Sequence, residues 1–274
     1  MLWQRLLTAL VLVPLVVAGI LYLDNGALAV VLGVVVLLGA YEMARLANLQ
    51  NVVAQGGFIL VVAVTLWLAW RYLQPAYLEY LQWIMATWWV LMTVALVIRR
   101  SELPQVHGSR PTILMLGGLV LVTAWASIVD LHATGERGPL MMLFLFVLIW
   151  VADSGAYFAG RAFGRRKLSP FVSPGKTWAG AGGAAAGAVL SALFLVAGAA
   201  AGDASLPGLI GLSILVTAVS IGGDLWESRL KREAGVKDSG NLLPGHGGIL
   251  DRVDSLLAAA PVFALGAGLA GLMA

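Results

Sequence analysis

Long apolar runs separated by short polar segments dominate this amino-acid sequence and leave few possible folds. The chain has 274 residues, of which 60% are hydrophobic and 11% are charged. A soluble protein of this length could not bury so much apolar surface, and apolar runs of about 18 residues or more are typical of membrane-spanning helices. We therefore predict an all-α polytopic membrane protein with about nine spans, at residues 6–23, 26–47, 57–73, 80–98, 112–130, 139–160, 178–200, 206–226 and 252–273.

The polar segments are too short to form a separate soluble domain, so we predict one integral membrane domain over residues 1–274. N-terminal helices occupy 1–130, and a catalytic part with its cytoplasmic loops occupies 139–274. Arg5 and the apolar run after it resemble a signal peptide. We expect this segment to be retained as the first span, because the run 6–23 is long enough to cross a membrane and a second apolar run follows at once.

The lysines and arginines are distributed unevenly between the two sides of the predicted bundle. If the N-terminus is cytoplasmic, Arg71 and Arg137 are the only two of the 17 Lys and Arg residues that fall in outside loops. Positive charge is enriched in cytoplasmic loops, so this asymmetry supports both the span count and the orientation. The two long inside segments, 161–177 and 227–251, then place an active site at the cytoplasmic side of the inner (cytoplasmic) membrane.

Carboxylates stand at the ends of the last two predicted spans. Asp224 directly follows apolar and small residues, and Asp251 and Asp254 open the ninth span. An unpaired carboxylate beside a membrane span is costly, and carboxylates from two neighbouring helix ends are suitable ligands for Mg²⁺. We predict metal ligation by Asp224 and Asp251. Helix capping is the alternative for one acid of the ninth span, and Glu227 and Lys231 are expected to form an ordinary surface pair.

A glycine-rich segment joins these two helix ends. Gly240, Gly245, Gly247 and Gly248 permit unusual backbone angles and a close approach of amides to an anion, although many loops are rich in glycine. A turn of this kind that leads into a helix N-terminus can bind phosphate. His246 is either a metal ligand or a loop hydrogen bonder, and we favour a hydrogen bond to phosphate or backbone because no second His or Cys lies nearby.

The other inside segment is basic and contains prolines. Lys176 and Thr177 follow Gly175 as in the end of a P-loop, but Pro170 occupies the position where that motif requires glycine, so we exclude a P-loop. Lys176 lies at the membrane surface beside a helix start, where it could capture phosphate. The basic run 165–167 serves either as a topological anchor or as a contact to anionic lipid heads.

Two more acids lie inside predicted spans and need partners there. Glu42 is near the end of the second span and could pair with Arg45, and Asp153 is near the end of the sixth span and could pair with a base such as Arg161.

The seventh span is rich in small residues. Gly183 and Gly187 stand at small-xxx-small spacing, which lets two helices approach closely. This contact could lie within one subunit or at a dimer seam.

The charged segment between the last two spans resembles the signature of the phosphatidate cytidylyltransferases, also called the CDP-diacylglycerol synthase family. That signature reads Ser-x-hydrophobic-Lys-Arg, four residues, Lys-Asp, a short glycine stretch, Pro-x-His-Gly-Gly, two residues, and Asp-Arg-hydrophobic-Asp. The matching residues are Ser228, Lys231, Arg232, Lys237, Asp238, Gly240, Pro244, His246, Gly247, Gly248, Asp251, Arg252 and Asp254.

A second motif of that family is matched at residues 173–180. Ala179 stands where the family often has a polar residue, which puts in doubt a side-chain role at that position but not at Lys176. Both motifs lie in the second half of the chain, and the first half resembles the family only as a stack of apolar spans.

The resemblance implies transfer of a cytidylyl group from CTP to phosphatidate, giving CDP-diacylglycerol and pyrophosphate. It further implies a Mg²⁺-dependent site between helix ends, a possible K⁺ ion in the metal centre and a homodimer in the lipid membrane, with no nucleic-acid partner. On this hypothesis the catalytic residues are Asp224, Asp251, Asp254 and Lys176, and the substrate-binding residues are Lys231, Lys237, His246, Arg252, Ser173 and Thr177.

Two other functions use similar features. A lipid or ion transporter would need polar groups at mid-depth in several spans, and Glu42 is the main candidate. Another CTP-dependent membrane enzyme, such as a polyprenol kinase, would share the nucleotide site but transfer the terminal phosphoryl group. The gathering of charge on one face favours the cytidylyltransferase.

Overall fold

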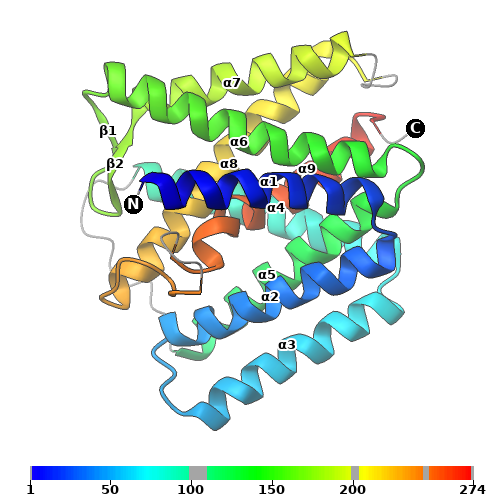
Figure 1. Ribbon diagram of the computed structural model, residues 1–274, viewed down its shortest axis with the longest axis vertical. Helices are drawn as coiled ribbons and strands as arrows, with labels where there is room; N and C mark the ends of the chain where they lie inside the picture. Colours follow the sequence, from blue (N-terminus) through cyan, green and yellow to red (C-terminus); the bar gives the residue numbers. More distant parts are fainter. Residues whose placement is uncertain (1, 99–109, 199–203, 243–246, 273–274) are drawn as a thin grey trace.

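The computed structural model describes residues 2–98, 110–198, 204–242 and 247–272 of the chain. Over these residues it contains nine α-helices and one two-stranded sheet (Figure 1). The elements are α1 (Leu2–Tyr22), α2 (Asn25–Leu46), α3 (Val52–Tyr72), α4 (Pro75–Ile98), α5 (Arg110–Ala133), α6 (Gly138–Phe163), β1 (Lys167–Ser169), β2 (Ser173–Thr177), α7 (Trp178–Ala197), α8 (Leu206–Glu233) and α9 (Leu250–Leu269).

Eight of these helices, α2 to α9, are long and apolar enough to cross a membrane. A helix satisfies its own backbone N–H and C=O groups, which is what a segment surrounded by lipid requires. The chain is therefore a multi-pass membrane protein, and the predicted helical organisation is confirmed apart from the small sheet.

Polar residues fix some helix boundaries that hydrophobicity alone misplaces. α3 begins at Val52, earlier than predicted, because the Asn51 side chain accepts a hydrogen bond of 2.8 Å from the Val53 amide and caps the helix. α8 continues beyond its apolar run to Glu233. This extension carries Lys231 and Arg232 of the signature on the helix.

α6 and α7 pack against each other through glycines. A Cβ atom at Gly183 of α7 would overlap the carbonyl oxygen of Gly155 in α6, and a Cβ atom at Gly187 would lie 3.0 Å from the carbonyl oxygen of Val151. Small residues allow this close approach of two backbones. The small-residue spacing therefore serves packing within the chain, and a dimer seam at these two glycines is excluded because α6 already covers them.

The small sheet was not predicted, because two short strands in a basic, proline-containing segment have the composition of a loop. β1 and β2 are antiparallel, with Lys167 opposite Thr177 and Ser169 opposite Ser173. The Ser169 hydroxyl donates a hydrogen bond of 3.0 Å to the carbonyl oxygen of Leu96 at the end of α4. The hairpin is thereby fixed to the bundle, and β2 leads directly into α7.

The polar segments lie together at one end of the bundle. α8 contacts both α7 and α9, and α9 also packs against α4 and α5. In Figure 1 the β-hairpin, the C-terminal end of α8 and the segment that leads to α9 lie at the end where α1 begins, whereas the chain finishes at the opposite end. The arrangement matches the prediction that both long polar segments share one face.

Candidate active site

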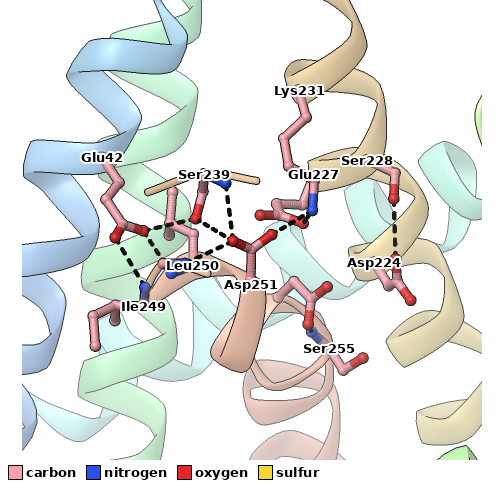
Figure 2. A network of polar contacts seen from close by, with 12 residues as sticks. Glu42, Asp224, Glu227, Ser228, Lys231, Ser239, Ile249, Leu250, Asp251 and Ser255 are labelled. Carbon is pink, nitrogen blue, oxygen red and sulfur yellow. Dashed lines mark hydrogen bonds and ion pairs between the residues drawn. The ribbon is translucent and has the colours of Figure 1, made fainter. Parts of the chain in front are cut away.

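Asp251, in the first turn of α9, is held by four hydrogen-bond donors. Its Oδ1 atom accepts a hydrogen bond of 2.5 Å from the Lys231 ammonium. Its Oδ2 atom accepts from the Ser239 amide at 2.9 Å, the Ser239 hydroxyl at 2.9 Å and the Gly248 amide at 2.8 Å. Figure 2 shows Asp251 between Ser239 and Lys231. A carboxylate in this place is also stabilised by the positive end of the α9 dipole.

Lys231 neutralises two acids at once. Its ammonium lies 2.5 Å from Glu227 Oε2 and 2.5 Å from Asp251 Oδ1. The predicted pair between Glu227 and Lys231 is confirmed, but its surface location is wrong, because only 2% of the Glu227 side chain and 13% of the Lys231 side chain are exposed. The pair is buried because α9 packs along α8 and covers this helical face. Lys231 therefore connects the end of α8 to the start of α9.

Asp224 lies one turn before Glu227 on α8 and has a different set of partners. Lys176 from β2 places its ammonium 2.6 Å from Asp224 Oδ2, and the Ser228 hydroxyl donates to Asp224 Oδ1 at 3.1 Å. This ion pair is partly accessible, with 23% of the Lys176 side chain and 35% of the Asp224 side chain exposed. The β-hairpin thus places Lys176, the base of the second motif, beside Asp224, which ends the apolar part of α8.

Other carboxylates surround Asp224. Asp254 of α9 lies within electrostatic range of Asp224 and Glu227, and its Oδ1 atom accepts a hydrogen bond of 2.7 Å from the Ser255 amide. Asp153 of α6 lies within range of Asp224 and Lys176. Three helices therefore contribute acidic groups around one lysine, an excess of negative charge that fits a divalent cation.

Asp153 has a base within range, as predicted, but this base is not the example that the sequence suggested. Arg161 instead donates a hydrogen bond of 3.0 Å to the Tyr157 hydroxyl on its own helix, and the base within range of Asp153 is Lys176.

The metal site itself stays a prediction. Over the described ranges, no three acidic or histidine side chains converge closely enough to enclose one ion. Asp224 contacts Lys176, whereas Asp251 contacts Lys231. The Glu227 carboxylate interacts electrostatically with both Asp224 and Asp251.

The remaining predicted residues have varied positions. Lys237 is exposed and lines a cavity of about 400 Å³ that also includes Arg45, Asn48 and Ser239. The Thr177 hydroxyl accepts a hydrogen bond of 3.1 Å from the Gly180 amide and caps α7.

Two more of these residues belong to α9 and β2. Arg252 is exposed in the first turn of α9, and Ser173 is half-buried at the start of β2. His246 lies outside the described residues.

Comparison with known proteins identifies the family. A sequence profile of the cytidylyltransferase family matches residues 3–268, nearly the whole chain. The chain belongs to the cytidylyltransferase family. Two similar relatives are the phosphatidate cytidylyltransferases of Pseudomonas aeruginosa, 45% identical over 96% of both chains, and of Haemophilus influenzae, 39% identical over 96% of this chain and 97% of the relative. The enzyme of the same name from Brucella suis is 51% identical over 47% of each chain.

Family membership confirms the resemblance drawn from the two motifs and extends it to the first half of the chain. In this cytidylyltransferase Ser228, Lys231 and Arg232 of the signature lie on the end of α8, and Asp251, Arg252 and Asp254 lie on the start of α9. The second motif forms β2 and the start of α7. The sequence had predicted a helical face for Asp224 to Lys231 and a helix start at Asp251, but it had treated residues 173–177 of the second motif as a loop.

Two contributors to the site were missed. Ser239 was not singled out, yet its amide and hydroxyl both bond Asp251. Glu42 was expected to pair with Arg45, but it is completely buried and bonds the start of α9, while the Arg45 guanidinium lies 5.9 Å from the centroid of the Tyr41 ring. The available signal was the cost of an acid within an apolar run, which requires a partner but does not name it.

Proposed function

We propose that this member of the cytidylyltransferase family converts CTP and phosphatidate into CDP-diacylglycerol and pyrophosphate. The observation that carries the proposal is that two phosphatidate cytidylyltransferases match almost the full length of the chain at 45% and 39% identity. The cluster of acids and lysines at the α8 and α9 ends supports it, because this chemistry must bring two anions together.

The reaction requires positioning and charge neutralisation more than a base. A phosphate monoester has its second pKa near 6, so the phosphatidate phosphate is largely dianionic at neutral pH. One of its oxygens would form a bond to the α-phosphorus of CTP while the bond to the bridging oxygen breaks, and pyrophosphate would leave with that electron pair. Such transfers depend on in-line alignment and on cations that cover the phosphate oxygens.

The lysines of the site suit this task. Lys176 and Lys231 already neutralise carboxylates at helix ends, and each could turn to a phosphate oxygen when the triphosphate arrives. Lys237, beside the cavity next to Ser239, would contact the nucleotide. We assign further substrate contacts to His246, Arg252, Ser173 and Thr177.

The acids would hold the metal ion. We propose that Asp224 and Asp251 bind Mg²⁺, with Asp254 as a third ligand or a supporting neighbour, because these carboxylates come from two packed helices and exceed the local positive charge. When bound, Mg²⁺ would supply positive charge to the triphosphate. A K⁺ ion in the same centre and a homodimer complete the proposal.

The site would face the cytoplasm, where CTP is available, and the protein would lie in the cytoplasmic membrane with its lipid substrate in the bilayer. The uneven distribution of lysines and arginines supports this orientation. The transporter alternative loses its main candidate, because both carboxylate oxygens of the buried Glu42 accept hydrogen bonds from α9.

The test uses purified protein in detergent with phosphatidate, Mg²⁺ and CTP labelled at either the α- or the γ-phosphorus. The proposal expects the α-label in the lipid product and the γ-label in pyrophosphate. A γ-label in the lipid would indicate a kinase, and no labelled lipid with either CTP would overturn the enzyme assignment.

Variants at the two acids test the metal site. Asp224→Asn and Asp251→Asn should each abolish Mg²⁺-dependent turnover while the protein still folds. Asp24→Asn is the matched control, because Asp24 caps α2 at the other end of the bundle and asparagine caps equally well. Activity close to that of the unaltered protein in either site variant would remove that residue from the metal site.

A further inference from the structure

We propose that Glu42 is a positioning residue, which fixes the start of α9 and, through Ser239, the carboxylate of Asp251. The inference rests on the proposed function, because Asp251 matters to catalysis only if the α8 and α9 ends form the active site. Glu42 belongs to α2, in the half of the chain that carries neither motif.

The contacts of Glu42 are with the segment that enters α9. Its Oε1 atom accepts a hydrogen bond of 2.9 Å from the Ile249 amide. Its Oε2 atom accepts one hydrogen bond of 2.9 Å from the Leu250 amide and another of 2.8 Å from the Ser239 hydroxyl (Figure 2). Ile249 occupies the cap position of α9 and has no side-chain cap of its own. Glu42 therefore supplies, from another helix, the acceptor that the first amides of α9 need.

A carboxylate is required here, and an amide of the same shape would not replace it. The Glu42 side chain is completely buried, where an ion is stable only if it is hydrogen-bonded. The Ile249 and Leu250 amides donate to different oxygens of Glu42, so both terminal atoms of its side chain must accept a hydrogen bond. Glutamine has one acceptor and one NH₂ group, and in either orientation the NH₂ group would face a backbone N–H.

Two glycines of the segment between α8 and α9 lie against the Glu42 carboxylate. A Cβ atom at Gly248 would overlap the Ser239 hydroxyl and both Glu42 carboxylate oxygens, and a Cβ atom at Gly240 would overlap Glu42 Oε1. Neither position can carry a side chain while Glu42 stays in place. Two glycines of the signature are therefore explained by contact with an acid about 200 residues earlier in the chain.

Ser239 connects Glu42 to the active-site acid. Its hydroxyl lies 2.8 Å from Glu42 Oε2 and 2.9 Å from Asp251 Oδ2, and its amide donates to Asp251 at 2.9 Å. One hydroxyl proton serves one acceptor at a time, so Ser239 lies between two carboxylates that compete for it. Moving Glu42 would move Ser239, and with it two of the four donors that orient Asp251.

The central variant is Glu42→Gln, and hydrogen exchange and kinetics are both measured on full-length protein. We expect the amides of Ile249 and Leu250 to exchange at least about 10-fold faster. We expect kcat per folded molecule to fall about 10- to 100-fold, the range typical of residues that orient a metal ligand, with KM for CTP changed less than about threefold.

Two control variants separate positioning from general stability. Met43→Ala removes a fully buried side chain from the next position on α2 and should lower stability, yet leave kcat per folded molecule and the exchange of Ile249 and Leu250 within about twofold. Glu79→Gln makes the same chemical change at an exposed site on α4 and should alter nothing.

Ser239→Ala tests the connection itself and serves if Glu42→Gln does not fold. It keeps the Glu42 bonds to the backbone of α9, so exchange at Ile249 and Leu250 should stay unchanged while kcat falls about 2- to 10-fold, the effect of one hydrogen bond. Activity of Ser239→Ala equal to that of the unaltered protein would overturn the connection.

Unchanged exchange or unchanged kcat per folded molecule in Glu42→Gln would overturn the positioning role. If the unaltered protein forms no CDP-diacylglycerol, the proposed function fails instead, and the exchange experiment still decides whether Glu42 fixes α9.

Discussion

Replacing Lys231 by methionine should destabilise the protein strongly, and a second substitution should restore it. Lys231→Met keeps most of the aliphatic stem but removes the ammonium that lies 2.5 Å from Glu227 and 2.5 Å from Asp251. The two acids respond differently. Asp251 retains three donors, from Ser239 and Gly248, whereas both Glu227 carboxylate oxygens are buried without a hydrogen bond other than the lysine contact.

The expected loss of folding stability in Lys231→Met follows from this difference between the two acids. Removing one partner of a buried ion pair costs about 3–5 kcal/mol, because the other charge stays buried without compensation. We expect the lower end, about 3 kcal/mol, because 13% of the Lys231 side chain is exposed and Glu227 can take up a proton. That corresponds to a change on the order of 100-fold in the folding equilibrium. In the double variant Lys231→Met/Glu227→Gln no uncompensated charge remains, and the loss should shrink to about 1 kcal/mol, so that the second substitution restores about 2 kcal/mol.

The assay is equilibrium unfolding of purified protein in mixed micelles, followed by circular dichroism for the four members of the mutant cycle. Lys237→Met is the stability control, because this lysine is exposed on the segment after α8 and its loss should cost little. Equal stability of Lys231→Met and Lys237→Met would refute the role given to the buried contacts of Lys231 with Glu227 and Asp251. So would a double variant no more stable than Lys231→Met.

Two further changes test the hairpin and the helix packing. Lys176→Ala should raise KM for CTP about 10-fold with little loss of stability, because its pair with Asp224 is partly exposed; unchanged steady-state kinetics would leave Lys176 as a topological anchor only. Gly183→Val should lower stability by about 3 kcal/mol by forcing α7 away from the Gly155 carbonyl, whereas Gly182→Val, with open space at its Cβ, should be tolerated; equal unfolding curves for the two variants would contradict the packing.

Local features of the sequence predicted a large part of this structure. The apolar runs located the nine helices of the described chain, because a membrane-spanning segment must satisfy its backbone internally. The spacing of Glu227 and Lys231 predicted their pair, since residues four apart share a helical face. The hairpin was missed because strands of three and five residues produce no clear alternation of hydrophobicity.

The candidate site divides in the same way. The density of charge between α8 and α9 marked the functional region, and its residue types indicated phosphate and metal chemistry before any geometry was known. The same charges did not indicate which acid would contact which base. Asp224 pairs with Lys176 of the hairpin, and Asp251 with Lys231, because β2, α8 and α9 meet at one end of the bundle.

The sequence by itself determined that the chain crosses the membrane repeatedly and that its charged end groups carry the chemistry, because hydrophobicity and desolvation act on each segment independently. Only the tertiary structure decided that Glu42 caps α9 and that Gly248 lies against it. A buried carboxylate must find donors, but the donors it finds depend on which helices pack together, and that is a property of the whole bundle rather than of any segment.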